Sequence, residues 1–192
     1  IAAEKSTSGI DDDQCPAVAR LPAVFARYHG KEALNEMIVK AMEVTNVNDV
    51  AAAYNSVFAD VLSRVAQKKP IRDALEAAAD AADDSIKSEL MDALSTSDAN
   101  STDYAGLVGR ACHLPTAGPV MFHILKHSND YADAVERNNL AGGDSAGRSL
   151  LIGAVMGYVY GIATPKGIPL SWILQIKDGA EIWAECEALA RA

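Results

Sequence analysis

Apolar residues recur every three or four positions along most of this chain, which is the spacing of one face of an α-helix. β-branched runs, which favour strands, are scarce. The pattern therefore predicts an all-α protein whose short helices pack their apolar faces together. The helices expected from it cover residues 15–29, 31–44, 49–67, 70–83, 84–96, 116–127 and 129–139, with a cap at 45–49 and a loop over 95–102. A last helix is expected to begin at Pro169, with a buried side formed by Trp172, Ile173, Ile176, Ala180 and Trp183.

The stretch from Leu140 to Gly161 differs from these amphipathic segments. A glycine pair and a polar turn lead into an almost uninterrupted apolar run over 150–163. This run is shorter than the roughly 20 residues that span a bilayer, so we expect a helix buried within the protein. Three glycines recur at a spacing of four, and each costs about 1 kcal/mol relative to alanine in a helix. They predict a face that another helix approaches closely: Gly153, Gly157 and Gly161.

The start of this helix is a candidate binding site. The first turn of a helix has unpaired N–H groups and a partial positive charge, and Arg148 adds a full one. Such a site can bind a phosphate, or a carboxylate that ligates a metal. The alternative is that Asp144 or Ser145 only caps the helix, which the spacing favours. The ligand-binding hypothesis involves Gly142, Gly143, Asp144, Ser145 and Arg148.

Cysteine and histidine side chains suggest a second place for chemistry. Cys112 and His113 are adjacent, and a thiol beside an imidazole is the combination of a nucleophile and its base. Adjacent side chains rarely face each other, so we favour a structural Cys112 and a hydrogen-bonded His113. His123 and His127 have the spacing of a zinc-hydrolase motif, but Ile124 stands where that motif needs a glutamate.

Several of these motifs together resemble a known family. Gly142-Gly143-Asp144, the glycine-rich helix, Gly167-Ile168-Pro169 and Trp172 are similar to the C-terminal signature of the ADP-ribosylglycohydrolases. These are all-helical enzymes that use two magnesium ions to cleave the glycosidic bond to ADP-ribose. Within the family, Gly142 to Arg148 and the motif Cys112 to Pro115 resemble the branch that contains selenoprotein J and the J-type crystallins of jellyfish lenses. This branch's motif would place His113 near the pocket.

The resemblance implies a domain organisation. We expect a flexible acidic arm over 1–13 and a single domain over 14–192, a compact orthogonal multi-helix fold of the ADP-ribosylglycohydrolase type that lacks its N-terminal third. The letters Ile10 to Gln14 are similar to the family's Thr-Asp-Asp-Thr-Gln metal motif, but the flanking threonines are absent. An acidic cluster at a helix start also complements the helix dipole, and we favour that interpretation for Asp11 to Asp13.

The resemblance also implies a magnesium site, for which this chain lacks ligands. Two magnesium ions need several converging oxygen ligands. Of the three C-terminal ligands in the hydrolase pattern only Asp144 is present, since Ala146 and Gly147 stand at the other two positions. Asp144 alone is expected to hold Mg²⁺ weakly, and Arg148 places a positive charge where a metal would lie. We expect that the dinuclear mechanism does not operate.

Charge and cysteine content narrow the cellular setting. The net charge of −9 argues against nucleic acid or an anionic membrane as a partner. Three widely spaced cysteines are typical of a reducing compartment inside the cell, and neither a signal peptide nor a transmembrane segment is evident. We expect a cytoplasmic protein, or one of a plastid or mitochondrion after removal of a transit peptide. The start at Ile1 would suit a processed or truncated form.

Three hypotheses for function follow. The first is a degenerate family member with a structural or assembly role, as a homo-oligomer or a subunit of a larger complex. The second is a module that binds ADP-ribose or another nucleotide at Asp144 to Arg148. The third is a magnesium-dependent ADP-ribosyl hydrolase with unusual ligands.

Overall fold

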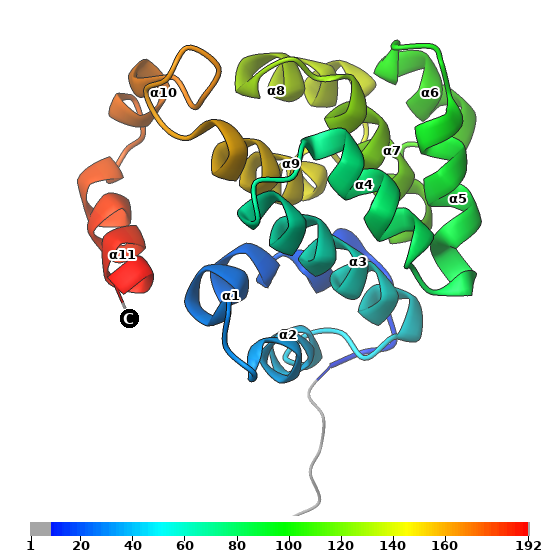
Figure 1. Cartoon of the computed structure of the whole chain (residues 1–192), viewed down its shortest axis with the longest axis horizontal. Helices are drawn as coiled ribbons and strands as arrows, with labels where there is room; N and C mark the ends of the chain where they lie inside the picture. Colours follow the sequence, from blue (N-terminus) through cyan, green and yellow to red (C-terminus); the bar gives the residue numbers. More distant parts are fainter. Residues whose placement is uncertain (1–8, 192) are drawn as a thin grey trace, which may run out of the picture.

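Two helices run through the middle of the molecule, and most of the other helices pack around them (Figure 1). They are α3 (Asp49–Ala66) and α7 (Leu114–His127) in this computed structural model, which describes residues 9–191. A 3-10 helix, η1 (Cys15–Val18), precedes α1. The remaining helices are α1 (Leu21–Tyr28), α2 (Leu34–Glu43), α4 (Ile71–Asp80), α5 (Asp84–Ser95), α6 (Ser101–Val108), α8 (Tyr131–Ala141), α9 (Ser145–Tyr160), α10 (Leu170–Leu174) and α11 (Gly179–Arg191).

The all-α prediction is confirmed. Over residues 9–191 the structure has no strand, only three isolated β-bridges. No helix in this range has both the length and the apolar character that a membrane crossing requires.

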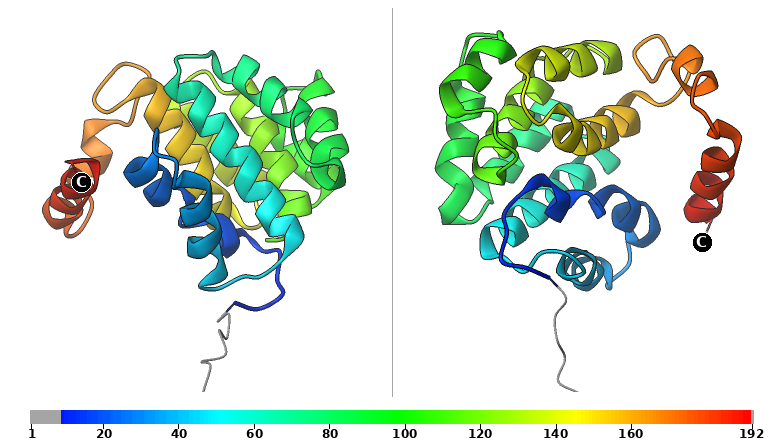
Figure 2. Two further views of the ribbon diagram at one scale, coloured as in Figure 1. Left: turned by 60° about the horizontal axis from the view of Figure 1, so that its bottom comes forward. Right: turned by 180° about the vertical axis from the view of Figure 1, so that it is seen from behind.

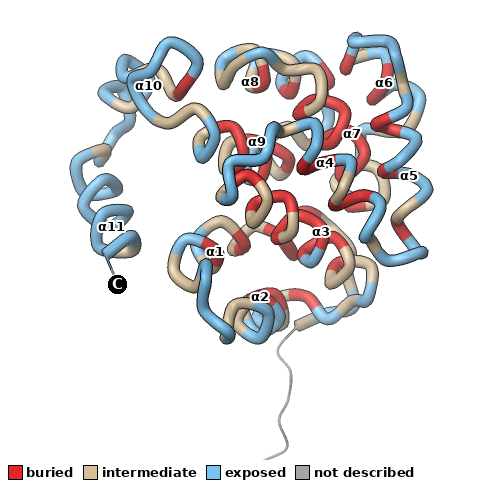
Figure 3. Tube along the Cα trace, in the orientation of Figure 1, coloured by how far each residue is buried: buried red, intermediate tan, exposed pale blue. Residues whose placement is uncertain are grey.

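The core lies where α3, α7 and α9 meet (Figure 3). Asn48 starts α3 by accepting a hydrogen bond from the backbone N–H of Ala51, which satisfies one of the free donors of the first turn. Along α3 the apolar side chains fall on one buried stripe, and Phe58 packs edge-on against Phe122 of α7. The expected start of this helix, with its cap at residues 45–49, agrees with the structure.

Helix boundaries differ from the prediction at two places, where a proline or a capping residue starts a new helix. The expected helix over 15–29 is divided into η1 and α1, because Pro22 occupies the first turn of a new helix instead of kinking one long helix. The expected loop over 95–102 ends early, and α6 was not predicted. Asn100 starts α6 by accepting from the N–H groups of Thr102 and Asp103, a cap that the polar composition of this stretch concealed.

The glycine face of α9 has a different neighbour from the one expected. Gly153 lies beside the hydroxyl of Tyr131, and Gly157 contacts Ile168 and the same tyrosine ring. The glycines therefore accommodate side chains from the start of α8 and from the loop after α9. They do not bring a second helix backbone close, as the spacing had suggested.

The C-terminal part also departs from the prediction. The helix expected from Pro169 onward, with a buried side at Trp172, Ile173, Ile176, Ala180 and Trp183, forms two helices, α10 and α11. Neither has a buried residue, and both stand at one side of the body formed by α1–α9 (Figure 2). α11 lies against α1, and Trp172 packs edge-on against Tyr131, but most of the large apolar side chains of α10 and α11 are exposed.

The segment before η1 is attached to the domain over its described part. Residues 1–8 of the expected arm lie outside the described residues. The N–H of Ile10 donates to the carbonyl of Thr45, and its own carbonyl accepts from Val47. Farther along, the carbonyl of Asp13 accepts from Leu114. Residues 10–13 thus follow the surface of the domain to the start of α7.

Gly118 of α7 provides a test of this packing. A methyl group on Gly118 would lie 2.1 Å from the ring of the buried Tyr54, so Gly118→Ala should force the core apart. We expect the free energy of unfolding to fall by about 1–3 kcal/mol in urea denaturation. The control is Gly106→Ala at an exposed position of α6, where the atom nearest to the added methyl group is the flexible end of Arg110 at 3.4 Å. It should be neutral or stabilising, and equal losses in the two variants would contradict this account.

Candidate functional site

Three segments that are distant in the sequence meet at one place, and we call it the three-loop junction. It consists of residues 10–15, 110–114 and 142–147. Leu114 N–H donates to the carbonyl of Asp13 over 2.9 Å, and Cys15 N–H donates to that of Cys112 over 2.9 Å. The third segment joins through Asp144, whose N–H donates to the carbonyl of Arg110 over 3.2 Å. The junction gathers both places where the sequence suggested chemistry.

The glycine pair shapes the third segment. Gly142 and Gly143 have φ of +71° and +64°, which side chains rarely adopt. A Cβ at Gly143 would lie 2.0 Å from the carbonyl oxygen of Arg110. The pair is therefore required by the turn and by the close approach of the 110–114 backbone.

Asp144 acts as the cap of α9. Its Oδ1 accepts from the N–H of Gly147 over 2.9 Å, and Ser145 is the first helical residue. The Cys15 thiol lies against the same carboxylate. Burial, and after it the negative charge of Asp144, raises the pKa of Cys15 to about 12, so the thiol stays protonated and unreactive.

Arg148 points into the protein. It is fully buried, and burial lowers its pKa. Its Nε donates to Oδ1 of Asn138 over 2.9 Å, and Nη2 donates to the carbonyls of Asn138 and Gly142 over 3.2 and 2.5 Å. The guanidinium thus ties the end of α8 to the glycine turn. The buried charge of Arg148 is close enough to the start of α9 to interact with Asp144.

Cys112 and His113 lie in separate hydrogen bonds. The Cys112 thiol donates to the side-chain oxygen of Gln14 over 3.1 Å. The His113 Nδ1 lies 2.5 Å from Oδ1 of Asp13. This contact raises the pKa of His113, whose side chain is 51% exposed. The two side chains do not form a nucleophile and base, in agreement with the interpretation favoured from the sequence.

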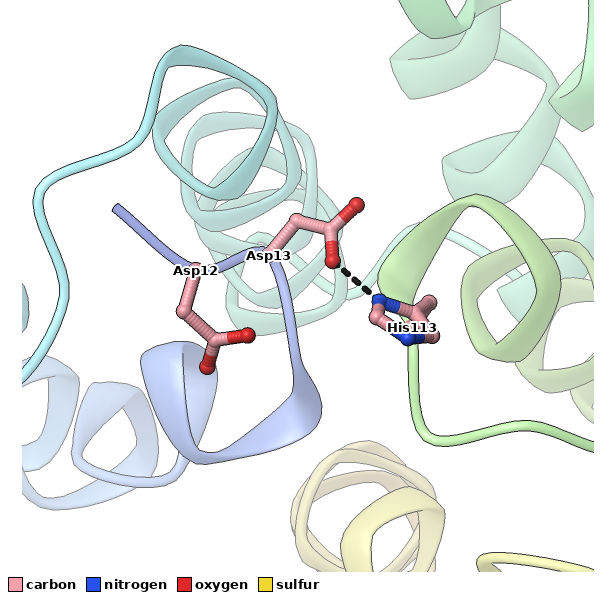
Figure 4. A group of neighbouring side chains, drawn as sticks. All are labelled: Asp12, Asp13 and His113. Carbon is pink, nitrogen blue, oxygen red and sulfur yellow. Dashed lines mark hydrogen bonds and ion pairs between the residues drawn. The ribbon is translucent and has the colours of Figure 1, made fainter. Parts of the chain in front are cut away.

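Asp12 joins this pair, as Figure 4 shows. One ligand atom each from Asp12, Asp13 and His113 lies within 4.8 Å of the others. Sequence reasoning did not find this group, because it treated the acidic run and His113 as separate features. The β-bridge between residues 14 and 113 that brings them together leaves no signal in the spacing.

His123 is a structural residue. Its ring is buried and stacks on Tyr104, with Nδ1 at 3.1 Å from Ser101 Oγ and Nε2 at 2.9 Å from the carbonyl of Asp98. Burial lowers the pKa of His123 to about 4, so the ring is neutral near pH 7. Both ring nitrogens already have partners.

The residues around Asp144 do not fit a dinuclear magnesium site. Position 147 has no space for a ligand side chain, since a Cβ there would lie 2.3 Å from Oδ2 of Asp144 and 2.6 Å from Cβ of Cys15. Ala146 offers no oxygen ligand, and the buried cation Arg148 lies behind them. A hollow of about 720 Å³ lies elsewhere, between α3 and the turn joining α4 to α5, and its lining combines alanines with Asp49, Asp60 and Asp83.

Arg148 should be essential for stability. In Arg148→Met the acceptors of Asn138 and Gly142 lose a charged donor in a buried place, and we expect the free energy of unfolding to fall by about 2–3 kcal/mol in denaturant titrations. Arg191→Met on α11 removes a surface pair with Glu187 and should change it by less than about 0.5 kcal/mol. If the two variants behave alike, Arg148 does not hold the turn.

Comparison with known proteins places this architecture in a family. Among curated proteins no match to the sequence was found. The sequence model of the ADP-ribosylglycohydrolases matches residues 2–192, which is nearly the whole chain. The all-helical fold agrees with that match. The chain therefore belongs to the ADP-ribosylglycohydrolase family.

Proposed function

We propose that this chain is a family member that does not hydrolyse ADP-ribosyl bonds and that has an assembly role, as a homodimer. The loss of hydrolysis is supported by one observation, which is that position 147 has no space for a side chain. Cys15 and Asp144 occupy the space that a ligand side chain would need there. Substituting a metal ligand at this position would force the N-terminal segment away from α9.

The charge at the same place supports the proposal. Magnesium sites gather negative charge, and the family's chemistry needs several carboxylates around two cations. Here Asp144 already accepts from Gly147 and lies close to the buried Arg148, which interacts favourably with it. The carboxylate is therefore used for helix capping and for balancing a fixed positive charge.

The proposed assembly role is supported by the two C-terminal helices, α10 and α11. α11 has 13 residues, and isolated helices of this length are marginal in water. Ile182, Trp183, Cys186 and Leu189 fall on one of its faces, and both Ile182 and Trp183 are 45% exposed. A hollow of about 460 Å³ between α10 and α11 has an almost entirely apolar lining. Exposed apolar surface of this kind is typical of an interface.

Another surface of the chain matches α11 in apolar character and complements it in charge, so a second copy could bind there. The outer side of α1, α3 and α9 has an apolar hollow of about 330 Å³ lined by Phe25, Leu62 and Tyr158, among others. Between residues 20 and 31 the chain has two arginines and one lysine but no acidic residue, whereas α11 carries three glutamates. We infer that α11 of each copy packs its apolar face on the α1–α9 side of the other. A two-fold dimer of this kind uses both surfaces twice.

The proposed absence of magnesium-dependent hydrolysis can be tested directly. Titration calorimetry of the protein with ADP-ribose, with and without magnesium, should give no saturable heat. ADP-ribosylated protein or nucleoside substrates should release no ADP-ribose above the buffer rate. Magnesium-dependent binding with turnover would show an active hydrolase. Binding without turnover would favour the nucleotide-binding hypothesis.

The dimer can be tested by one matched pair of variants. Trp183→Glu places a charge in the apolar face of α11, and we expect it to convert the dimer to a monomer in light scattering after size exclusion. Ala184→Glu places the same charge on the opposite face of the helix and should leave the dimer intact. A wild-type protein that is monomeric at tens of micromolar would contradict the assembly role.

A further inference from the structure

We propose that Asp12, Asp13 and His113 form a binding site for a single first-row transition-metal dication, for which zinc is the best match. Within residues 9–191, this is the group whose carboxylate and imidazole atoms gather closely enough to share one ion. It differs from the magnesium site of the family pattern, since His113 supplies a nitrogen ligand and Asp144 takes no part in it.

The backbone already holds the ligands in place. On one side, Ile10 is hydrogen-bonded to the residues on both sides of Asn46, which fixes the chain just before Asp12. On the other side, the bond from Leu114 to the carbonyl of Asp13 fixes the position of Asp13 relative to His113. The ligand-bearing segments would therefore need little ordering on metal binding, which favours affinity.

Asp12 is oriented by a residue behind it. The side-chain amide of Asn46 is nearly buried and donates to both the carbonyl and Oδ2 of Asp12, over 2.9 and 3.1 Å. This arrangement leaves Oδ1 of Asp12 available as a ligand. Hydrogen bonds that orient a ligating carboxylate are a regular feature of protein metal sites.

Asp13 and His113 are arranged so that an ion can replace a proton. Nδ1 of His113 and Oδ1 of Asp13 are 2.5 Å apart and share one hydrogen. A tetrahedral zinc ion with ligands at about 2.1 Å separates its ligand atoms by about 3.4 Å. An outward rotation of the half-exposed His113 ring would widen the spacing toward that value, and the Asp12 ligand atom lies within 4.8 Å of the other two.

The donor set selects the class of ion. Magnesium and calcium prefer oxygen ligands alone, whereas an imidazole nitrogen favours zinc and its neighbours. Three protein ligands leave the fourth tetrahedral position to water, and the exposure of His113 gives the ion access from solvent. The bound ion would join the N-terminal segment to the start of α7.

Titration calorimetry of the whole chain with zinc chloride tests the proposal. We expect one zinc per chain, and at least a tenfold loss of affinity in Asp13→Asn and in His113→Gln. Magnesium chloride at millimolar concentration should give no binding heat. Zinc should also raise the melting temperature of the wild type but not of the two variants. Circular dichroism establishes that each variant is folded.

Two controls distinguish this site from adventitious binding. Asp11→Asn removes a neighbouring carboxylate that is outside the group and is hydrogen-bonded to Asn48, so zinc affinity should change by less than about twofold. Cobalt bound in place of zinc should show no thiolate charge-transfer band. The proposal is overturned by absence of zinc binding, by unchanged affinity in His113→Gln, or by a thiolate band that assigns the metal to the cysteines. None of these outcomes depends on whether the chain dimerises or hydrolyses ADP-ribose.

Discussion

The backbone hydrogen bonds between residues 13–15 and 112–114 hold the functional region together. They fix the acidic segment against the start of α7, and they bring Cys15 against the cap of α9. The chemistry of each nearby side chain depends on this contact. It pairs His113 with Asp13, turns Cys112 toward Gln14, and keeps the Cys15 thiol protonated beside Asp144. Without these bonds, the three segments would be ordinary connections between helices.

The same contact determines how the residues at the start of α9 are used in this chain. Gly147 allows Cys15 to pack against α9, and Arg148 supplies a buried positive charge that stabilises the glycine turn. Both residues serve stability at the place where the hydrolase pattern needs metal ligands. The core of the described residues lies along α3, α7 and α9 and consists of apolar side chains.

The sequence alone predicted the helical class, the start of α3, the glycine turn and the capping role of Asp144, because each depends on residues close together in the chain. It missed α6, whose cap at Asn100 lies in a polar stretch that looked like a loop. It also missed the group at Asp12, Asp13 and His113, since a bridge between residues 14 and 113 has no local pattern. Arg148 was a candidate ligand-binding residue because its charge is visible in the sequence. Its buried hydrogen-bond partner on α8, Asn138, is not visible there.

The bond between Asp13 and His113 closes a loop of 100 residues. Because closing a loop of this length costs more entropy than forming a local turn, we expect this contact to form late in folding. During synthesis, residues 10–14 must wait until most of the chain has left the ribosome before they find their place. The region that contains the chemically distinctive side chains is therefore also expected to be among the last parts of the molecule to assemble.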